Sequence, residues 1–188
     1  MFYGNVKEAI PPNAPEPHGR PVVLRIYVDA GRAGDGMDRR SRTGYVMFLN
    51  SAVVNWYSKK QGSVEGATFG SEFMAMKTAA EVNRGFRYKL RMMGVPIDGP
   101  TYVYGDNMSV LHNTSNPEST LKKKSNSIAY HVVREACAMN EMQTGYINTL
   151  DNVSDMMTKP QPRGERRERL LRQVMWDIHA VRTPQADD

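Results

Sequence analysis

The chain has 188 residues, of which 40% are hydrophobic and 24% charged, as expected for one globular domain with its own core. Its formal net charge of +5 is only mild evidence for a polyanionic partner, because many basic domains bind no polyanion. With Cys137 as its single cysteine it forms no intrachain disulfide, and it contains no apolar run of about 18 residues that would span a membrane. We expect an intracellular, cytoplasmic protein without a signal peptide, because the first residues lack an apolar signal core.

The two ends of the chain differ in composition from its middle. Residues 1–21 contain five prolines, which predict an extended linker or arm rather than a folded unit. Residues 181–188 are polar and are expected to form a flexible tail. The domain itself is therefore expected to span residues 22–180.

Hydrophobic periodicity predicts the elements of this domain in order. Alternating, β-branched residues predict strands at 22–29, 43–49 and 52–59, and Trp56 in the third of them is expected in the core. Residues 67–93 are typical of one long helix, which Gly94 and Pro96 end. The later elements are a strand at 101–105, helices at 107–113 and 126–140, a strand at 142–148, a helix beginning near Val153 and an amphipathic helix at 164–178.

The order of these elements predicts the fold class. Three strands joined by short turns favour an antiparallel meander, and strands reached through helices favour parallel additions to it. We expect an α/β fold with a mixed five-stranded sheet, three strands antiparallel and two parallel, and helices on both faces.

Four acidic residues are the candidate functional groups. Asp29 and Asp106 end predicted strands, where ligands gather in open α/β sheets, and Asp155 lies in the first turn of a late helix. Taken singly, such residues are usually turn, cap or helix-dipole residues. Glu72 is unusual by itself, because it borders the buried stripe of the long helix and a buried carboxylate is costly without a positive partner. Four converging carboxylates would suit divalent metal ions held against a phosphodiester.

The stretch from Tyr27 to Pro162 resembles the RNase H domain of copia-type LTR retrotransposon polyproteins. The motifs that carry the resemblance are Val28-Asp-Ala30, Arg39-Arg-Ser41, Thr43-Gly-Tyr-Val46, Trp56-Tyr-Ser-Lys-Lys-Gln61, Ser71-Glu-Phe73, Gly105-Asp-Asn107, Tyr130-His-Val-Val-Arg-Glu135 and Asp155-Met-Met-Thr-Lys-Pro160. The resemblance implies an RNase H-like fold and endonucleolytic cleavage of the RNA strand of RNA–DNA hybrids, leaving 5′-phosphates. It also implies a reverse transcriptase domain of the same polyprotein as partner, and a retrotransposon virus-like particle as the setting.

The same resemblance implies two Mg²⁺ or Mn²⁺ ions as cofactors. Asp29, Glu72, Asp106 and Asp155 match the family's metal ligands, and Asp29 would bridge the two ions. The chain departs from common family patterns at Gly31, Met108 and Ser125, which stand where many members have Asp, Gln and His. The loop at residues 149–154 lacks the His that cellular enzymes carry there. His131 is a possible auxiliary group in its place, and the alternative is a structural side chain on a helix flank.

Several residues are candidates for contact with nucleic acid. Thr68 matches a threonine that holds a DNA phosphate in cellular enzymes, and Asn107 would reach a 2′-hydroxyl. Basic residues that would contact the backbone are Lys122, Lys123, Lys124, Arg39 and Arg40, although a solvated charged face is the usual explanation for such groups.

Two other functions remain open at this point. One is a catalytically inactive RNase H-like module that only binds nucleic acid or connects domains, against which the four intact acids argue. The other is an integrase-type strand transferase, which shares the fold but usually has three acids and separate zinc-binding and DNA-binding parts. No such parts are visible in the sequence.

Overall fold

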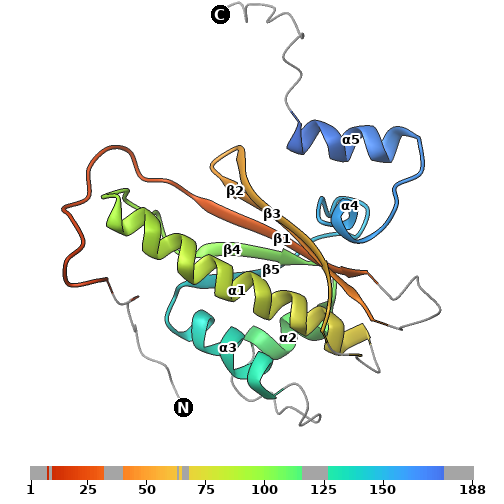
Figure 1. Ribbon diagram of the computed structural model, residues 1–188, viewed down its shortest axis with the longest axis horizontal. Helices are drawn as coiled ribbons and strands as arrows, with labels where there is room; N and C mark the ends of the chain where they lie inside the picture. The colour runs from red at the N-terminus through yellow and green to blue at the C-terminus, as the bar shows by residue number, and fades with distance from the viewer. Residues whose placement is uncertain are drawn as a thin grey trace, which may run out of the picture.

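The computed structural model describes residues 8, 10–31, 40–62, 64, 68–115 and 127–175. Figure 1 shows a central sheet with helices on its two sides. The strands are β1 (Leu24–Gly31), β2 (Arg42–Leu49), β3 (Ala52–Lys60), β4 (Thr101–Gly105) and β5 (Met142–Tyr146). The helices are α1 (Thr68–Met92), α2 (Met108–Ser115), α3 (Ser127–Ala138), α4 (Asp155–Thr158) and α5 (Glu165–Val174).

The sheet has the strand order β3-β2-β1-β4-β5. β1 pairs antiparallel with β2, and β2 with β3, whereas β4 pairs parallel with β1, and β5 with β4. Asn50 turns the chain between β2 and β3 with a φ of 55°, in the left-handed region that asparagine tolerates better than most residues. The expected mixed sheet of three antiparallel and two parallel strands is confirmed.

Each face of the sheet has its own apolar core, because successive side chains of a strand point to opposite faces. Ile26 and Val28 of β1 pack with Phe73 of α1 in a cluster that also includes residues of α2 and α3. On the opposite face, Val46 of β2 packs with Leu170 of α5. Helices therefore cover both faces, as the sequence predicts.

The boundaries differ from the sequence-based expectation in a few places. β1 continues to Gly31, because its pairing with β2 extends to Arg42, so that Asp29 lies inside the strand and not at its end. α5 ends at Val174, and residues 176–188, with the predicted end of this helix and the predicted tail, lie outside the described residues. The expectation that Trp56 is in the core is wrong: 65% of this residue is exposed, because β3 is the edge strand and the helices that bury its partner Val46 do not cover it.

The proline-rich segment forms no helix or strand over residues 10–21. It lies beside the C-terminal end of α1. The backbone N–H of His18 donates to the carbonyl of Gly94 at 2.9 Å. Further out, the Glu8 carboxylate pairs with Arg87 at 2.6 Å and with Arg91 at 2.5 Å. Burial opposes ionisation of Glu8, but these two guanidinium groups hold its pKa below the usual value. The described part of the arm is thus attached to the domain.

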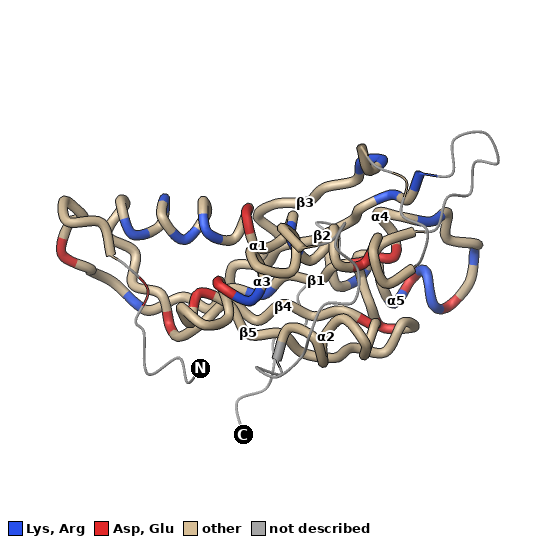
Figure 2. Tube along the Cα trace, turned by 90° about the horizontal axis from the view of Figure 1, so that it is seen from below, with Lys and Arg blue, Asp and Glu red and all other residues tan. Residues whose placement is uncertain are grey.

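Figure 2 shows that Lys and Arg positions recur along α1, and that Lys and Arg positions alternate with Asp and Glu positions in the part of the chain that forms α4 and α5. None of the helices in the described ranges is both long enough and apolar enough to cross a membrane.

Candidate metal centre

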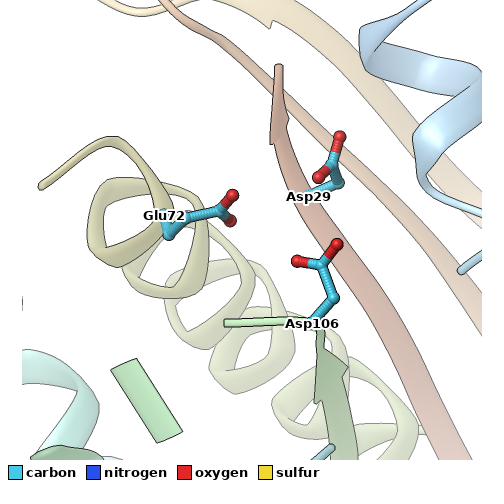
Figure 3. Close-up of side chains that lie close together, drawn as sticks. All are labelled: Asp29, Glu72 and Asp106. Carbon is cyan, nitrogen blue, oxygen red and sulfur yellow. The ribbon is translucent and has the colours of Figure 1, made fainter. Parts of the chain in front are cut away.

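Three carboxylates from separate elements meet beside the carboxyl ends of β1 and β4. Asp29 comes from β1, Glu72 from the second turn of α1, and Asp106 from the residue that follows β4. Each offers one oxygen atom, and these oxygens all lie within 4.8 Å of one another. Figure 3 shows the three side chains pointing toward a common centre. β1 and β4 are parallel neighbours that pair Tyr27 with Tyr104, so Asp29 and Asp106, each two residues further along, come side by side. α1 crosses the sheet, and its buried side supplies the third carboxylate.

The electrostatics of this cluster suit a cation. Burial raises the pKa of Glu72 to about 9, and the nearby Asp29 and Asp106 add to the effect. The pKa of Asp29 is also raised, chiefly by burial, although a hydrogen bond from Thr158 opposes the rise. Carboxylate oxygens are the donors that Mg²⁺ and Mn²⁺ prefer, and a divalent ion at their centre would offset their repulsion. The donor set therefore fits the implied metal.

The cluster opens into a cavity of about 500 Å³. Residues that line it are Asp29, Ala30, Thr68, Glu72, Asp106, Asn107, Met108, Ser109, Tyr146 and Lys159. The expected phosphate contact Thr68 and the expected sugar contact Asn107 thus lie at the same cavity as the acids. The side-chain oxygen of Asn107 accepts the backbone N–H groups of Ser109 and Val110, so this residue also caps α2.

Asp155 is bound by cations and stands apart from the three-carboxylate cluster. Its Oδ1 atom lies 2.5 Å from Nζ of Lys159, and its Oδ2 atom lies 2.8 Å from a guanidinium nitrogen of Arg166. Although burial opposes ionisation, hydrogen bonds from these two cations lower the pKa of Asp155. Nζ of Lys159 is also 3.5 Å from Oδ2 of Asp29. The structure therefore joins Asp155 to the cluster through the Lys159 ammonium.

Two glycines let α4 approach the sheet closely. A Cβ atom at Gly44 would lie 2.6 Å from Cγ2 of Thr158, and one at Gly31 would lie 2.8 Å from the Thr158 carbonyl oxygen. This approach lets the Thr158 hydroxyl donate a hydrogen bond to Oδ2 of Asp29. The absence of a side chain at residue 31, where family members often have Asp, is therefore a packing requirement of this chain.

Polar contacts hold the segment before α4 in place. The buried Asn152 donates from Nδ2 to the carbonyl of Val28 at 2.9 Å, and its Oδ1 accepts the Ser154 hydroxyl at 2.6 Å. Thr149, in the loop without a histidine, donates its hydroxyl to Oδ2 of Asp106 at 2.7 Å. Residues 149–158 thus contact Asp29 and Asp106 in addition to supplying Asp155.

Of the remaining sequence candidates, those in the described part of the chain do not line this cavity. His131 is exposed on α3, with its ring edge-on to Tyr130 at 5.4 Å, and it is absent from the described residues that line the cavity. Arg40 is exposed just before β2. Arg39, Lys122, Lys123, Lys124 and Ser125 lie outside the described residues.

Sequence reasoning missed several residues of the site. Lys159 and Thr158 lie within the quoted Asp155-to-Pro160 motif, so proximity to Asp155 was a usable signal. Arg166 is 11 residues from Asp155 and reaches it only through the turn before α5. Tyr146 is 53% exposed at the end of β5 and lines the cavity, and it belongs to none of the sequence motifs.

Solved structures define the class of fold. The N-terminal RNase H domain of a Mycobacterium tuberculosis protein, solved as a fusion with maltose-binding protein, superposes with a TM-score of 0.55 at 14% identity, covering 73% of this chain and 96% of that chain. LC11-RNase H1, solved in complex with an RNA/DNA hybrid, also has a TM-score of 0.55, at 17% identity over 72% of this chain and 93% of that chain. The chain has the RNase H-like fold that the sequence predicts.

Sequence relatives then indicate the kind of protein. The retrovirus-related Pol polyprotein from transposon RE1 of Arabidopsis thaliana is 28% identical over 142 residues, or 76% of this chain. This chain spans about a tenth of the length of that relative. No protein-family model matches the chain. The relatives and the fold together confirm the resemblance to the RNase H domain of an LTR retrotransposon polyprotein.

Proposed function

We propose that the chain is a metal-dependent endoribonuclease that cuts the RNA strand of RNA–DNA hybrids during reverse transcription of a retrotransposon. The observation that carries the proposal is the convergence of Asp29, Glu72 and Asp106 beside a cavity in an RNase H-like fold. Three buried or half-buried carboxylates so close together are costly for a fold alone, which favours a role in binding a cation. The relatives among Pol polyproteins support the biological setting, a virus-like particle inside the cell.

The catalytic roles of the acids follow from their positions. Asp29, Glu72 and Asp106 would hold one ion, and a second ion would lie between Asp29 and Asp155, where Lys159 now pairs with both. When bound there, divalent ions would stabilise the charge that develops on the phosphate and acidify the attacking water. The chain's own part is to orient these carboxylates: Thr158 fixes Asp29, and Thr149 fixes Asp106. Hydrolysis would leave a 5′-phosphate and a 3′-hydroxyl.

The cavity would bind the hybrid through groups beside the acids. Thr68 at the start of α1 would contact a DNA phosphate, and Asn107 the 2′-hydroxyl that distinguishes RNA from DNA. Tyr146 offers an exposed ring for apolar contact with a sugar or base. Lys122, Lys123, Lys124, Arg39 and Arg40 would add salt-sensitive backbone contacts, and the reverse transcriptase domain of the polyprotein would share the same hybrid.

One observation favours the inactive module as the second candidate. Both carboxylate oxygens of Asp155 are already paired with cations, at 2.5 Å and 2.8 Å. If these pairs persist when hybrid binds, the domain would bind nucleic acid without cutting it.

Cleavage of a labelled substrate panel separates the two candidates. We expect Mg²⁺-dependent or Mn²⁺-dependent cutting of RNA in a hybrid, abolished by chelation, and little cutting of duplex RNA, duplex DNA or single-stranded RNA. Binding to the hybrid without any metal-dependent cutting would favour the inactive module. Efficient cutting of duplex RNA would contradict the proposed substrate.

A further inference from the structure

We propose that Lys159 is a resident cation that occupies the second metal position of this site in the nucleic-acid-free protein, so that the free chain binds one divalent ion. This inference rests on the proposed metal-dependent function and concerns which cations occupy that same site before substrate enters.

The first argument is the position of the ammonium group. Nζ of Lys159 lies 2.5 Å from Oδ1 of Asp155 and 3.5 Å from Oδ2 of Asp29. An ion that bridges two carboxylates lies within about 2.0–2.6 Å of an oxygen of each, so the ammonium stands in the space that a bridging ion would need. Two cations cannot share that space, because like charges so close repel strongly.

The second argument is that the other groups around Asp155 complete its coordination. Its Oδ2 atom accepts a hydrogen bond from Arg166 at 2.8 Å and another from Gln161 at 3.2 Å. Oδ2 of Asp29, the oxygen that faces Lys159, also accepts the Thr158 hydroxyl. An ion that entered between Asp29 and Asp155 would have to displace these donors, whereas the oxygens of Asp29, Glu72 and Asp106 that face one another form a ready set of ligands.

The third argument is the balance of charge. The four carboxylates carry four negative charges when all are ionised, and Lys159 and Arg166 supply two positive charges in direct contact with them. Two negative charges remain, which one divalent ion neutralises. A second divalent ion would leave the site with excess positive charge until a phosphate of the hybrid arrives.

Lys159 is also able to leave the site. Its side chain is 43% exposed at the edge of the cavity, in contrast to the buried carboxylates that it joins. An entering phosphate would offer the ammonium a new anionic partner, which frees Asp155 for a second ion. Lys159 thereby couples the arrival of substrate to completion of the site.

Titration with Mn²⁺ in the absence of nucleic acid tests this role. By calorimetry, the wild-type chain should bind one Mn²⁺ per chain, and Lys159→Met should bind two. The dissociation constant of the second ion should be at least about tenfold lower in Lys159→Met than for any weak second binding by the wild type. Lys159→Arg, which keeps the charge, should still bind one. Lys77→Met is the matched control, because Lys77 also pairs with an acid one helical turn away, at 3.2 Å from Glu81 on α1.

Two further variants keep the test decisive if Lys159→Met does not fold. Asp155→Asn should retain the single ion with unchanged affinity, and Asp106→Asn should lose it. Two ions bound with similar affinity by the wild type, or loss of the single ion in Asp155→Asn, would overturn the inference. Since these titrations contain no substrate, a chain that binds one ion but cuts no hybrid would support this inference and contradict the proposed activity.

Discussion

Glu72 is the residue at which burial and function conflict most directly. Only 8% of it is exposed, and its pKa of about 9 means that the folded, metal-free chain keeps this carboxyl protonated at neutral pH. The position of Glu72 beside an apolar stripe was sufficient to single it out from the sequence. The contact of Asp155 with Arg166 was not predictable in the same way, because Pro160 and Pro162 mark a break between two helices but do not show where the second helix returns.

This conflict predicts how stability depends on pH without metal. The pKa of Glu72 is 4.5 in the unfolded chain and about 9 in the folded chain. Between these two pH values, the folded chain binds a proton on Glu72 that the unfolded chain has lost. The stabilisation is therefore complete below pH 4.5 and is lost as pH rises toward 9. In chelator, Glu72→Gln should flatten this decline and unfold at higher urea concentration than the wild type at pH 8.

The matched control for this experiment is Glu81→Gln on the exposed side of the same helix, where Glu81 is 53% exposed. This variant should keep the pH dependence of the wild type. An equal decline of unfolding free energy with pH in wild type and Glu72→Gln would show that Glu72 is not the group responsible.

At the scale of elements, the placement of α4 on β1 and β2 decides the geometry of the site. The sequence predicts a helix near Val153, and its motif marks Asp155, but the periodicity of a single turn cannot show which face of the sheet it contacts. That contact depends on Gly31 and Gly44, whose missing side chains admit Thr158. Trp56 shows the same limit: a strand pattern does not reveal which strand lies at the edge, where an apolar side chain stays exposed.

Gly44→Ala should therefore damage the site through α4. Its new Cβ would lie 2.6 Å from Cγ2 of Thr158 and 2.7 Å from Cβ of Met157, so α4 must move. We expect a loss of about 1–3 kcal/mol in the free energy of unfolding, typical of overpacking, together with reduced cleavage of hybrid.

Gly85→Ala in α1 is the control, because a Cβ there meets no atom within 4 Å. It should raise stability by up to about 1 kcal/mol, the helix-propensity difference, and leave cleavage unchanged. A Gly44→Ala chain with wild-type stability and activity would contradict the proposed close packing of α4.

At the scale of the whole molecule, the proline-rich arm contacts the C-terminal end of α1 through Glu8 and His18. Its prolines predict an extended linker, and residues 10–21 form no helix or strand, but composition could not predict that Glu8 meets two guanidinium groups 79 and 83 residues away. Arg87 is only 2% exposed and also donates to the Gly99 carbonyl and to Thr101. The arm thus supplies the only carboxylate among the partners of Arg87 within the ranges that the structure describes.

Glu8→Gln should destabilise the domain, because it leaves a buried guanidinium without a counter-charge. We expect a loss of about 1–3 kcal/mol in the free energy of unfolding, the range for a buried polar group that loses its partner. A chain that begins at residue 22 should lose at least as much. The control is Glu16→Gln in the exposed part of the arm, and urea unfolding of all four chains is the measurement. Equal stability of the truncated and full chains would show that the domain begins after the arm.

The carboxylates of Asp29, Glu72 and Asp106 are proposed to hold metal for hydrolysis of RNA in a hybrid. The most direct measurement compares cleavage of end-labelled RNA in a hybrid by wild type, Asp106→Asn and Asp98→Asn in millimolar Mg²⁺, with melting temperatures recorded in chelator. Asp98 is an exposed aspartate outside the cavity lining and serves as the control. We predict that the wild type and Asp98→Asn cut the RNA, and that Asp106→Asn loses cleavage while its melting temperature stays the same or rises. Cleavage by Asp106→Asn at the wild-type rate would show that Asp106 holds no metal needed for hydrolysis.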